Sequence, residues 1–219
     1  MRVQMIKRAL AAAIAVLAVA GPARAPAAER PVAIVALGDS LTAGYGLANQ
    51  EAFPARLQQA LAAKGIAVTV SNAGVSGDTM SGGLARLDWS VPPGTDAVIL
   101  ELGANDALRG LDPAVTRRAL DTILAALARR NIPVLLCGML APRNLGADYA
   151  GAFDPMYPEL AKKYGALLYP FFLDGVAADA KLNQPDGLHP TAAGIDVIVA
   201  KTLPKVEELI ARARSRQGT

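Results

Sequence analysis

Five short apolar runs recur along this chain, and each is bounded by Gly, Pro, Asn or Asp. Most of them lack polar alternation, which is typical of strands that are buried on both faces of a sheet. The runs are Val32–Leu37, Ile66–Val70, Ala97–Leu102, Val134–Leu140 and Ala166–Leu168. This pattern predicts an α/β protein with five parallel strands.

Helical patterns separate the apolar runs. Asp112 and Asp154 each precede a proline and are expected to be N-caps, whereas Gly65 is a suitable helix end. We expect Pro204 to kink or interrupt the last helix. The expected helices are Glu51–Lys64, one from Asp112-Pro113 to Arg130, Met156–Tyr164, and a last one after Pro190. This alternation predicts right-handed crossovers and a three-layer α/β/α sandwich around the sheet.

The N-terminus has the three parts of a secretory signal peptide. Basic residues precede an apolar run over 9–20, and Gly21-Pro22 and small residues follow it. This run is short for a bilayer span, so an uncleaved membrane anchor fits less well. We expect residues 1–27 to be a signal peptide, with cleavage between Ala25 and Glu29. Residues 28–219 then form one exported domain, periplasmic or secreted, because 219 residues with 53% hydrophobic content suit one core.

Composition argues against several classes of partner. Residues 1–27 carry four basic residues and no acidic one, so their removal changes the formal net charge from +3 to −1. We therefore expect no nucleic-acid partner. The single cysteine, Cys137, excludes an intramolecular disulfide and is expected to be a buried thiol. With one cysteine and one histidine, we expect neither a metal site nor another cofactor.

Polar motifs follow the first three apolar runs. Gly38-Asp39-Ser40 follows the first run, Gly77-Asp78 the second, and Gly103-Ala104-Asn105-Asp106 the third. In open parallel sheets, ligands bind beyond the carboxyl ends of the strands, which is where these motifs fall. The loop before the last helix could bring Asp186 and His189, the only histidine of the chain, to the same edge.

An acid, an imidazole and a hydroxyl are the parts of a serine hydrolase triad. Asp186 stands three residues before His189, so one loop could set its carboxylate against the imidazole. Ser40 could be the nucleophile, or only a helix N-cap, and His189 could be a cap with a solvated Asp186. The phosphate-binding pattern Gly-x-x-x-x-Gly-Lys-Ser/Thr and the Gly-x-Ser-x-Gly elbow are both absent from the sequence.

An oxyanion formed at this edge would need hydrogen-bond donors. The Asn105 side chain and the Gly77 N–H are candidates, although Gly and Asn are also ordinary turn residues. Gly74 competes with Gly77 for this role, and spacing alone does not separate the two.

Taken in order, these motifs resemble the SGNH (GDSL) hydrolase family, in which Ser, Gly, Asn and His head four blocks. The resemblance is closer to the branch that holds periplasmic thioesterase I/protease I/lysophospholipase L1 and arylesterases. One departure is Ala104, where close relatives often have a second glycine. The shared segments are Leu37–Tyr45, Ser76–Thr79, Gly82–Leu87, Glu101–Gly110, Tyr157–Ala161 and Asp186–Pro190.

The resemblance implies a flavodoxin-like SGNH hydrolase fold and a role for each motif. Ser40 would be the nucleophile, with Asp186 and His189 as the rest of the triad. The oxyanion hole would consist of the Ser40 N–H, the Gly77 N–H and the Asn105 side chain, so Gly77 is favoured over Gly74. The loop Ala107–Asp112 resembles a mobile loop that shapes the acyl groove in that branch. We therefore expect substrate contacts from Leu108, Leu111 and the loop Met139–Leu145.

Together these features predict a serine esterase for carboxylic esters and thioesters, of the lysophospholipase, acyl thioesterase or arylesterase type. Two alternatives are an SGNH carbohydrate (acetyl) esterase, which would need a shallow polar site, and a non-catalytic exported binding module. We expect a small-molecule acyl substrate, no stable membrane anchor after signal cleavage, and a monomer. The motifs specify the reaction rather than the acyl chain length.

Overall fold

Five parallel strands form one sheet in the order β2-β1-β3-β4-β5. The computed structural model describes residues 30–217, so the expected signal peptide lies outside the described residues. The parallel five-stranded sheet predicted from the apolar runs is confirmed. The strands are β1 (Val32–Gly38), β2 (Val68–Gly74), β3 (Ala97–Glu101), β4 (Val134–Cys137) and β5 (Leu167–Tyr169).

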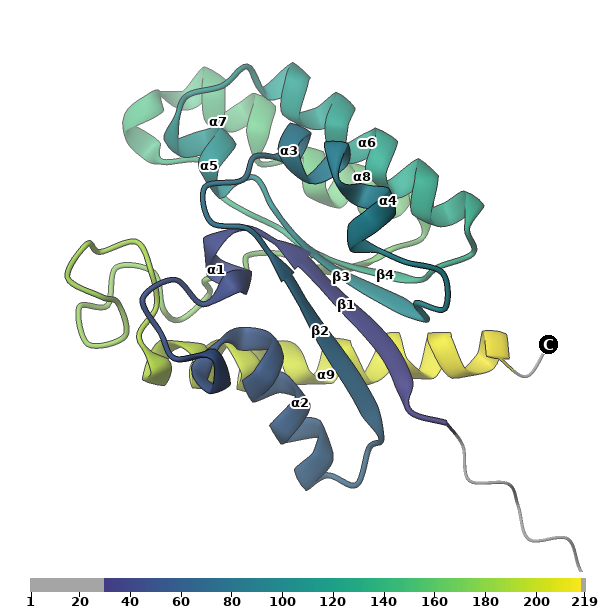
Figure 1. The fold of residues 1–219 in the computed structure, drawn as a ribbon. Coiled ribbons are helices and arrows are strands. Elements are labelled where there is room, and N and C mark those ends of the chain that lie inside the picture. The colour runs from purple at the N-terminus through teal and green to yellow at the C-terminus, as the bar shows by residue number, and fades with distance from the viewer. Residues whose placement is uncertain (1–29, 218–219) are drawn as a thin grey trace, which may run out of the picture.

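Helices cover both faces of this sheet, which confirms the three-layer sandwich (Figure 1). One layer contains α2 (Phe53–Ala63) packed beside α9 (Ala192–Gln217). The other layer contains α3 (Met80–Ala85), α4 (Leu87–Ser90), α6 (Pro113–Arg129) and α8 (Met156–Tyr164). The remaining short segments are α1 (Ser40–Ala43), α5 (Ala104–Leu108), α7 (Ala147–Phe153), and the 3₁₀ turns η1 (Asn49–Glu51) and η2 (Arg143–Leu145).

Two of the predicted helix ends are confirmed and one is wrong. Asp112 caps α6 by accepting a hydrogen bond from the Ala114 N–H at 2.8 Å, and Gly65 follows α2 with a φ of +72°. Asp154, however, does not cap α8. Its carboxylate accepts hydrogen bonds from the Ala141 N–H at 2.8 Å and from Arg143 at 2.9 Å, because the chain folds back over it.

Strand β2 and helix α9 also differ from expectation. The second strand was predicted at Ile66–Val70, whereas β2 covers Val68–Gly74. The prediction followed the apolar residues, but β2 is an edge strand with polar residues on its exposed face and needs no continuous apolar stretch. Helix α9 continues through Pro204 without interruption. Pro204 and Ala200, whose carbonyl would otherwise accept from residue 204, are both exposed, so water can satisfy that carbonyl.

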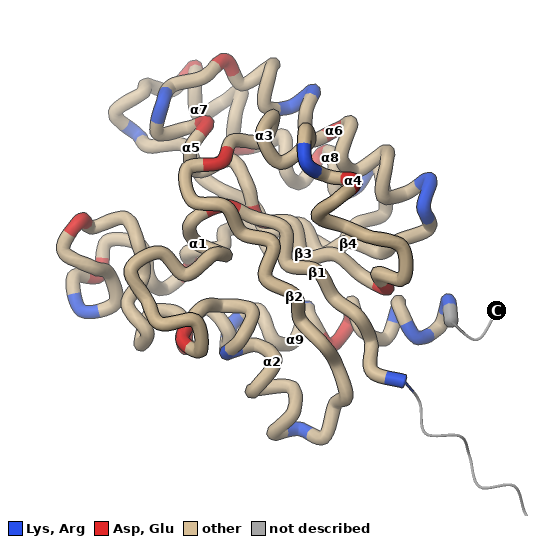
Figure 2. The backbone as a smooth tube through the Cα atoms, viewed as in Figure 1, with Lys and Arg blue, Asp and Glu red and all other residues tan. Residues whose placement is uncertain are grey.

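The interior of the sheet is almost free of charge. Both signs of charge are spread over the helices and loops (Figure 2), and Glu101 is the only charged residue in the five described strands.

Cys137 is fully buried, as predicted. Within residues 30–217, no helix combines the length and apolar character needed to cross a membrane.

Candidate active site

Ser40 lies in a sharp turn at the carboxyl end of β1. Asp39 caps α1 by accepting the Leu41 N–H at 3.0 Å, so the alternative that Ser40 itself is the N-cap is wrong. Gly38 is required by close packing, since a Cβ there would lie 2.0 Å from the Thr42 hydroxyl oxygen and 2.6 Å from the Glu101 carbonyl oxygen. The turn therefore leaves the Ser40 side chain at the edge of the sheet.

The loop before α9 brings an imidazole to that hydroxyl. His189 Nε2 lies 2.9 Å from Ser40 Oγ, and His189 Nδ1 lies 2.7 Å from Asp186 Oδ2. The other carboxylate oxygen of Asp186 accepts the backbone N–H groups of Leu188 at 2.9 Å and His189 at 3.0 Å. These hydrogen bonds lower the pKa of Asp186 to about 2, so the carboxylate stays ionised. The structure thus pairs Asp186 with the imidazole, which differs from the alternative of a solvated Asp186 beside a capping histidine.

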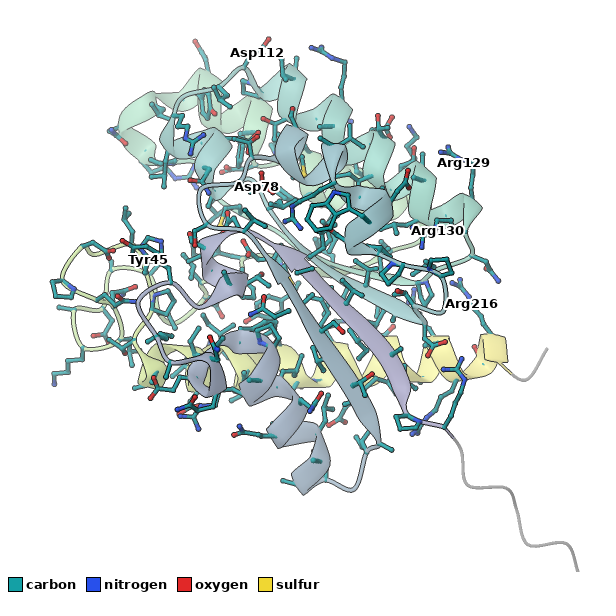
Figure 3. The ribbon with its side chains drawn as sticks, in the orientation of Figure 1. Tyr45, Asp78, Asp112, Arg129, Arg130 and Arg216 are labelled. Carbon is teal, nitrogen blue, oxygen red and sulfur yellow. The ribbon has the colours of Figure 1, made fainter. Side chains whose placement is uncertain are left out.

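Two residues without a predicted role, Tyr45 and Gln184, support the loop that carries His189, and Tyr45 also lies against the imidazole ring. The Tyr45 and His189 ring centroids lie 4.5 Å apart at an interplanar angle of 36°. Gln184 Nε2 donates to the Tyr45 carbonyl oxygen at 2.7 Å and to the Pro190 carbonyl oxygen at 3.0 Å, which ties the two loops together. Figure 3 shows Tyr45 among the loops at one end of the molecule, far from Arg130 and Arg216 at the other.

The structure separates Gly77 from Gly74 as a donor of hydrogen bonds. The Gly74 N–H donates to Asn72 Oδ1 at 3.0 Å, and a Cβ on Gly74 would lie 2.3 Å from the Ala43 nitrogen. Gly74 therefore serves packing. Among residues 30–217, no acceptor takes the Gly77 N–H, and the φ of Gly77 is +82°. The Gly77 carbonyl oxygen accepts from Arg109 at 2.8 Å.

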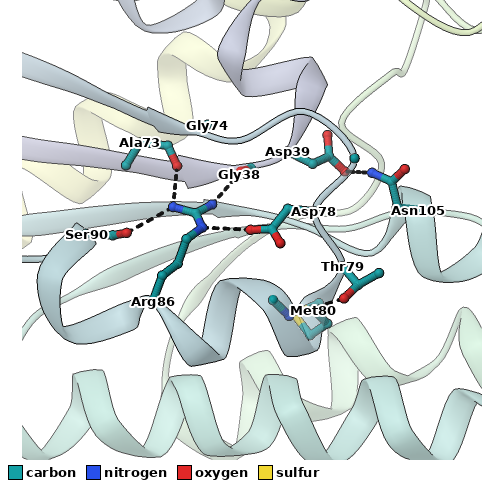
Figure 4. A network of polar contacts seen from close by, with 12 residues as sticks. Gly38, Asp39, Ala73, Gly74, Asp78, Thr79, Met80, Arg86, Ser90 and Asn105 are labelled. Atoms are coloured by element: carbon teal, nitrogen blue, oxygen red, sulfur yellow. Dashed lines mark hydrogen bonds and ion pairs between the residues drawn. The ribbon is translucent and has the colours of Figure 1, made fainter.

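Asn105 is the second residue of α5, and its side chain points toward Asp39. Its Nδ2 donates to Asp39 Oδ2 at 3.2 Å, which uses one of the two amide protons and leaves the other (Figure 4). Burial raises the pKa of Asp39 to about 6, although the hydrogen bonds from Leu41 and Asn105 oppose this shift. Asp39 thus connects the helix that carries Ser40 with the Asn105 amide.

A second buried carboxyl group lies behind Asp39. Glu101 accepts the Thr42 hydroxyl at 2.7 Å, and its other carboxyl oxygen has no hydrogen-bond partner among the described residues. Burial, followed by the charge of Asp39, raises the pKa of Glu101 well above its ordinary value. Glu101 is therefore a fully buried carboxyl group beneath the turn, and its environment favours the protonated form.

An apolar pocket of about 230 Å³ opens beside Ser40 and His189. Leu108 lines it, as predicted, together with Met139, Leu140 and Pro142 from the predicted loop. Leu111 does not line the pocket, because the Tyr149 hydroxyl binds the Leu111 carbonyl oxygen and holds that segment on the outside. The other lining residues are Leu41, Ala104, Asn105, Ala107, Phe171, Leu173 and Leu188. No Asp, Glu, Lys or Arg side chain lines this pocket, so it suits a hydrocarbon chain.

Residues 36–197, a stretch that contains every motif described above, match the GDSL-like Lipase/Acylhydrolase family. The chain belongs to this family. It is 36% identical to Esterase TesA of Pseudomonas aeruginosa over 178 residues, which cover 81% of this chain and 89% of that protein. It is 40% identical to Thioesterase 1/protease 1/lysophospholipase L1 of Escherichia coli (strain K12) over 168 residues, covering 76% and 78%.

Crystal structures of relatives share the fold of this GDSL-family chain. AlinE4, an SGNH-hydrolase family esterase, superposes with a TM-score of 0.70 at 49% identity, covering 83% of this chain and 98% of that one. TesA superposes with a TM-score of 0.77 at 36% identity, covering 81% and 99%. The α/β SGNH hydrolase fold implied by the sequence motifs is therefore confirmed.

Several residues of this GDSL-family site carry no recognisable signal in the sequence. Asp39 and Arg86 lie in quoted motifs, yet nothing in the sequence marks either side chain as buried. Tyr45 and Gln184 are joined across 139 positions of the chain, and no local sequence pattern could have paired them.

Within residues 30–217, no three His, Cys, Asp or Glu side chains are grouped so that they could hold a metal ion.

Proposed function

We propose that this chain is a serine esterase that hydrolyses carboxylic esters and thioesters. The observation that carries the proposal is the unbroken hydrogen-bonded series Asp186, His189 and Ser40, with separations of 2.7 and 2.9 Å, beside an apolar pocket. A nucleophile, a base and an acid that orients the base are the parts that acyl transfer needs.

In the first half of the cycle, His189 Nε2 takes the proton of Ser40 as Oγ attacks the acyl carbonyl carbon. Negative charge develops on the carbonyl oxygen, where the N–H groups of Ser40 and Gly77 and the remaining Asn105 amide proton stabilise it. His189 then protonates the leaving alcohol or thiol, and the acyl group stays on Ser40. Asp186, ionised by its low pKa, stabilises the imidazolium throughout.

In the second half, water replaces the leaving group. His189 deprotonates the water as it attacks the acyl carbon, and the same donors stabilise the second tetrahedral intermediate. His189 returns the proton to Ser40, and the carboxylic acid leaves. The cycle uses no group beyond these side chains, the backbone and water.

The pocket favours an acyl chain over a sugar as the group beside Ser40. Its walls are mainly Leu, Met, Phe, Pro and Ala side chains, whereas an acetylated sugar needs several polar partners. The relatives, an esterase and a thioesterase/protease/lysophospholipase, support the same substrate class. We further propose that the protein is exported to the periplasm or beyond, loses residues 1–27 and acts as a monomer.

The test is hydrolysis of p-nitrophenyl esters by the wild type, Ser40→Ala and His189→Ala. We expect both substitutions to lower kcat/KM by at least about a thousandfold. Unimpaired turnover in either variant would exclude the triad, and an inactive wild type would favour the binding module. Faster hydrolysis of acetylated sugars than of butyrate to decanoate esters would favour the carbohydrate esterase.

A further inference from the structure

A buried arginine connects the turn that carries Gly77 to the strand that leads to Ser40. Arg86 Nε donates to Asp78 Oδ2 at 2.7 Å, and Asp78 directly follows Gly77. Arg86 Nη2 donates to the Gly38 carbonyl oxygen at 2.8 Å, two residues before Ser40. Figure 4 shows the guanidinium between these partners. One rigid group thus spans the two backbone segments that would supply the N–H donors of the oxyanion hole.

Arg86 is fixed by two further hydrogen bonds. Its Nη1 donates to the Ala73 carbonyl oxygen at 2.8 Å, at the end of β2, and to the Ser90 hydroxyl at 3.0 Å, on α4. The planar guanidinium presents its donors in a fixed fork, so its partners must keep one relative geometry. A lysine could satisfy fewer of them and would leave their spacing free.

The ion pair between Arg86 and Asp78 is largely buried and closely packed. The side chains of Arg86 and Asp78 are only 8% and 15% exposed. Gly82 makes room for the carboxylate, since a Cβ there would lie 1.9 Å from Asp78 Oδ1. The Val75 N–H also donates to the Gly38 carbonyl oxygen at 3.0 Å, so the turn is attached to β1 at two places. A pair taken out of water is a poor way to gain stability alone, which argues for a positional role.

We propose that Arg86 and Asp78 are positioning residues for the oxyanion hole. The ion pair holds the Gly77 N–H at the distance from the Ser40 N–H at which both can donate to one oxygen. Neither side chain touches the substrate. The proposal rests on the proposed esterase function, and it assigns to this pair an effect on the transition state rather than on the binding of the ester.

The expected kinetic signature follows from when the oxyanion forms. Its charge develops in the transition state, so a displaced donor lowers kcat and leaves KM almost unchanged. Loss of one whole donor costs about 100- to 1000-fold in kcat, and a donor that is displaced but present should cost less. We expect Asp78→Asn and Arg86→Lys to lower kcat about ten- to hundredfold, with KM within threefold of the wild type.

The experiment compares these variants with Asp96→Asn. Asp96 pairs with Arg30 through a carboxylate that is only 9% exposed, so this control also removes a largely buried acid from an arginine pair. We measure kcat and KM for p-nitrophenyl butyrate, the Tm of each variant, and the rate at which an alkyl phosphonate ester labels Ser40. Asp96→Asn should keep the kcat of the wild type even if its Tm falls.

The outcomes separate this proposal from the proposed function. An inactive wild type overturns both. An active wild type with kcat for Asp78→Asn within twofold, or with a loss that appears only in KM, overturns the positioning role alone. If Arg86→Lys is unfolded at the assay temperature, the isosteric Asp78→Asn decides, because it removes the charge of the pair without changing the size of the side chain. Slower phosphonate labelling in Asp78→Asn, at unchanged KM, supports the proposal.

Discussion

The replacement of Asp186 by asparagine tests the role of the acid in the triad with the least change in shape. One oxygen of Asp186 accepts two backbone N–H groups, from Leu188 and His189, and the other faces His189 Nδ1. An asparagine oxygen would keep the two backbone bonds, so its NH2 group would face Nδ1. The imidazole would then have to carry its proton on Nε2, where it cannot accept the proton of Ser40.

The size of the effect follows from the alternative orientation of the amide. A flipped amide would restore the acceptor at Nδ1 but lose two backbone hydrogen bonds, each a factor of about five in population. The flipped orientation, the one that allows catalysis, would therefore be rarer than the other by a factor of about 25. The loss of the negative charge opposite the imidazolium lowers kcat further. In other triads the same substitution costs about 10⁴ in kcat. We expect kcat to fall between about 25-fold and 10⁴-fold.

The assay is steady-state hydrolysis of p-nitrophenyl butyrate, with Asp88→Asn on the exposed surface of α4 as the matched control. Because Asp186 lies in a partly exposed loop, the Tm of Asp186→Asn should stay within a few degrees of the wild type. The reasoning would be refuted if Asp186→Asn kept kcat within threefold, or if Asp88→Asn lost as much.

Three further predictions follow. Asn105→Ala removes a side-chain donor, so kcat should fall about 100- to 1000-fold with little change in KM, and an unchanged kcat would exclude the amide from the oxyanion hole. Leu108→Asp puts a charge on the pocket wall, so the ratio of kcat/KM for octanoate over acetate esters should fall about tenfold, since each buried CH2 contributes about 0.8 kcal/mol. Leu111→Asp, outside the pocket, should keep that ratio. If Leu111→Asp and Leu108→Asp lower the ratio equally, the acyl chain of the substrate does not bind in this pocket. Glu101→Gln replaces the carboxyl group with an uncharged amide of nearly the same shape. The raised pKa of Glu101 makes the wild type lose stability as the pH rises above about 4.5, whereas glutamine does not titrate. The Tm of Glu101→Gln minus the Tm of the wild type should therefore be larger at pH 8 than at pH 4.

The sheet was predictable because buried parallel strands need continuous apolar residues, and β1, β3 and β4 have them. Strand β2 was misplaced because an edge strand with an exposed face can be polar, as Ser71 and Asn72 are. Short helices such as α1 and α5 have too few residues to show a period, so no pattern predicts them.

The meeting of Ser40, His189 and Asp186 was also predictable, because few residue types suit the proposed chemistry and the chain has one histidine. The residues that position these side chains were not predictable. Arg86 reads as a surface arginine in the sequence, and only the meeting of β1, β2 and the Gly77 turn makes it a buried partner. The resemblance of the loop Ala107–Asp112 to a groove-shaping loop predicts Leu111 in the pocket, but Leu111 does not line it, and the Tyr149 hydroxyl donates to the Leu111 carbonyl oxygen.

The central claim is that Ser40 attacks the acyl carbon. The most direct measurement is the intact mass and peptide map of the protein after reaction with a p-nitrophenyl alkyl phosphonate. We expect one phosphonyl group per chain, attached to Ser40, with none on Ser40→Ala and a greatly reduced rate on His189→Ala. A phosphonyl group on another residue, or equal labelling of Ser40→Ala, would contradict it.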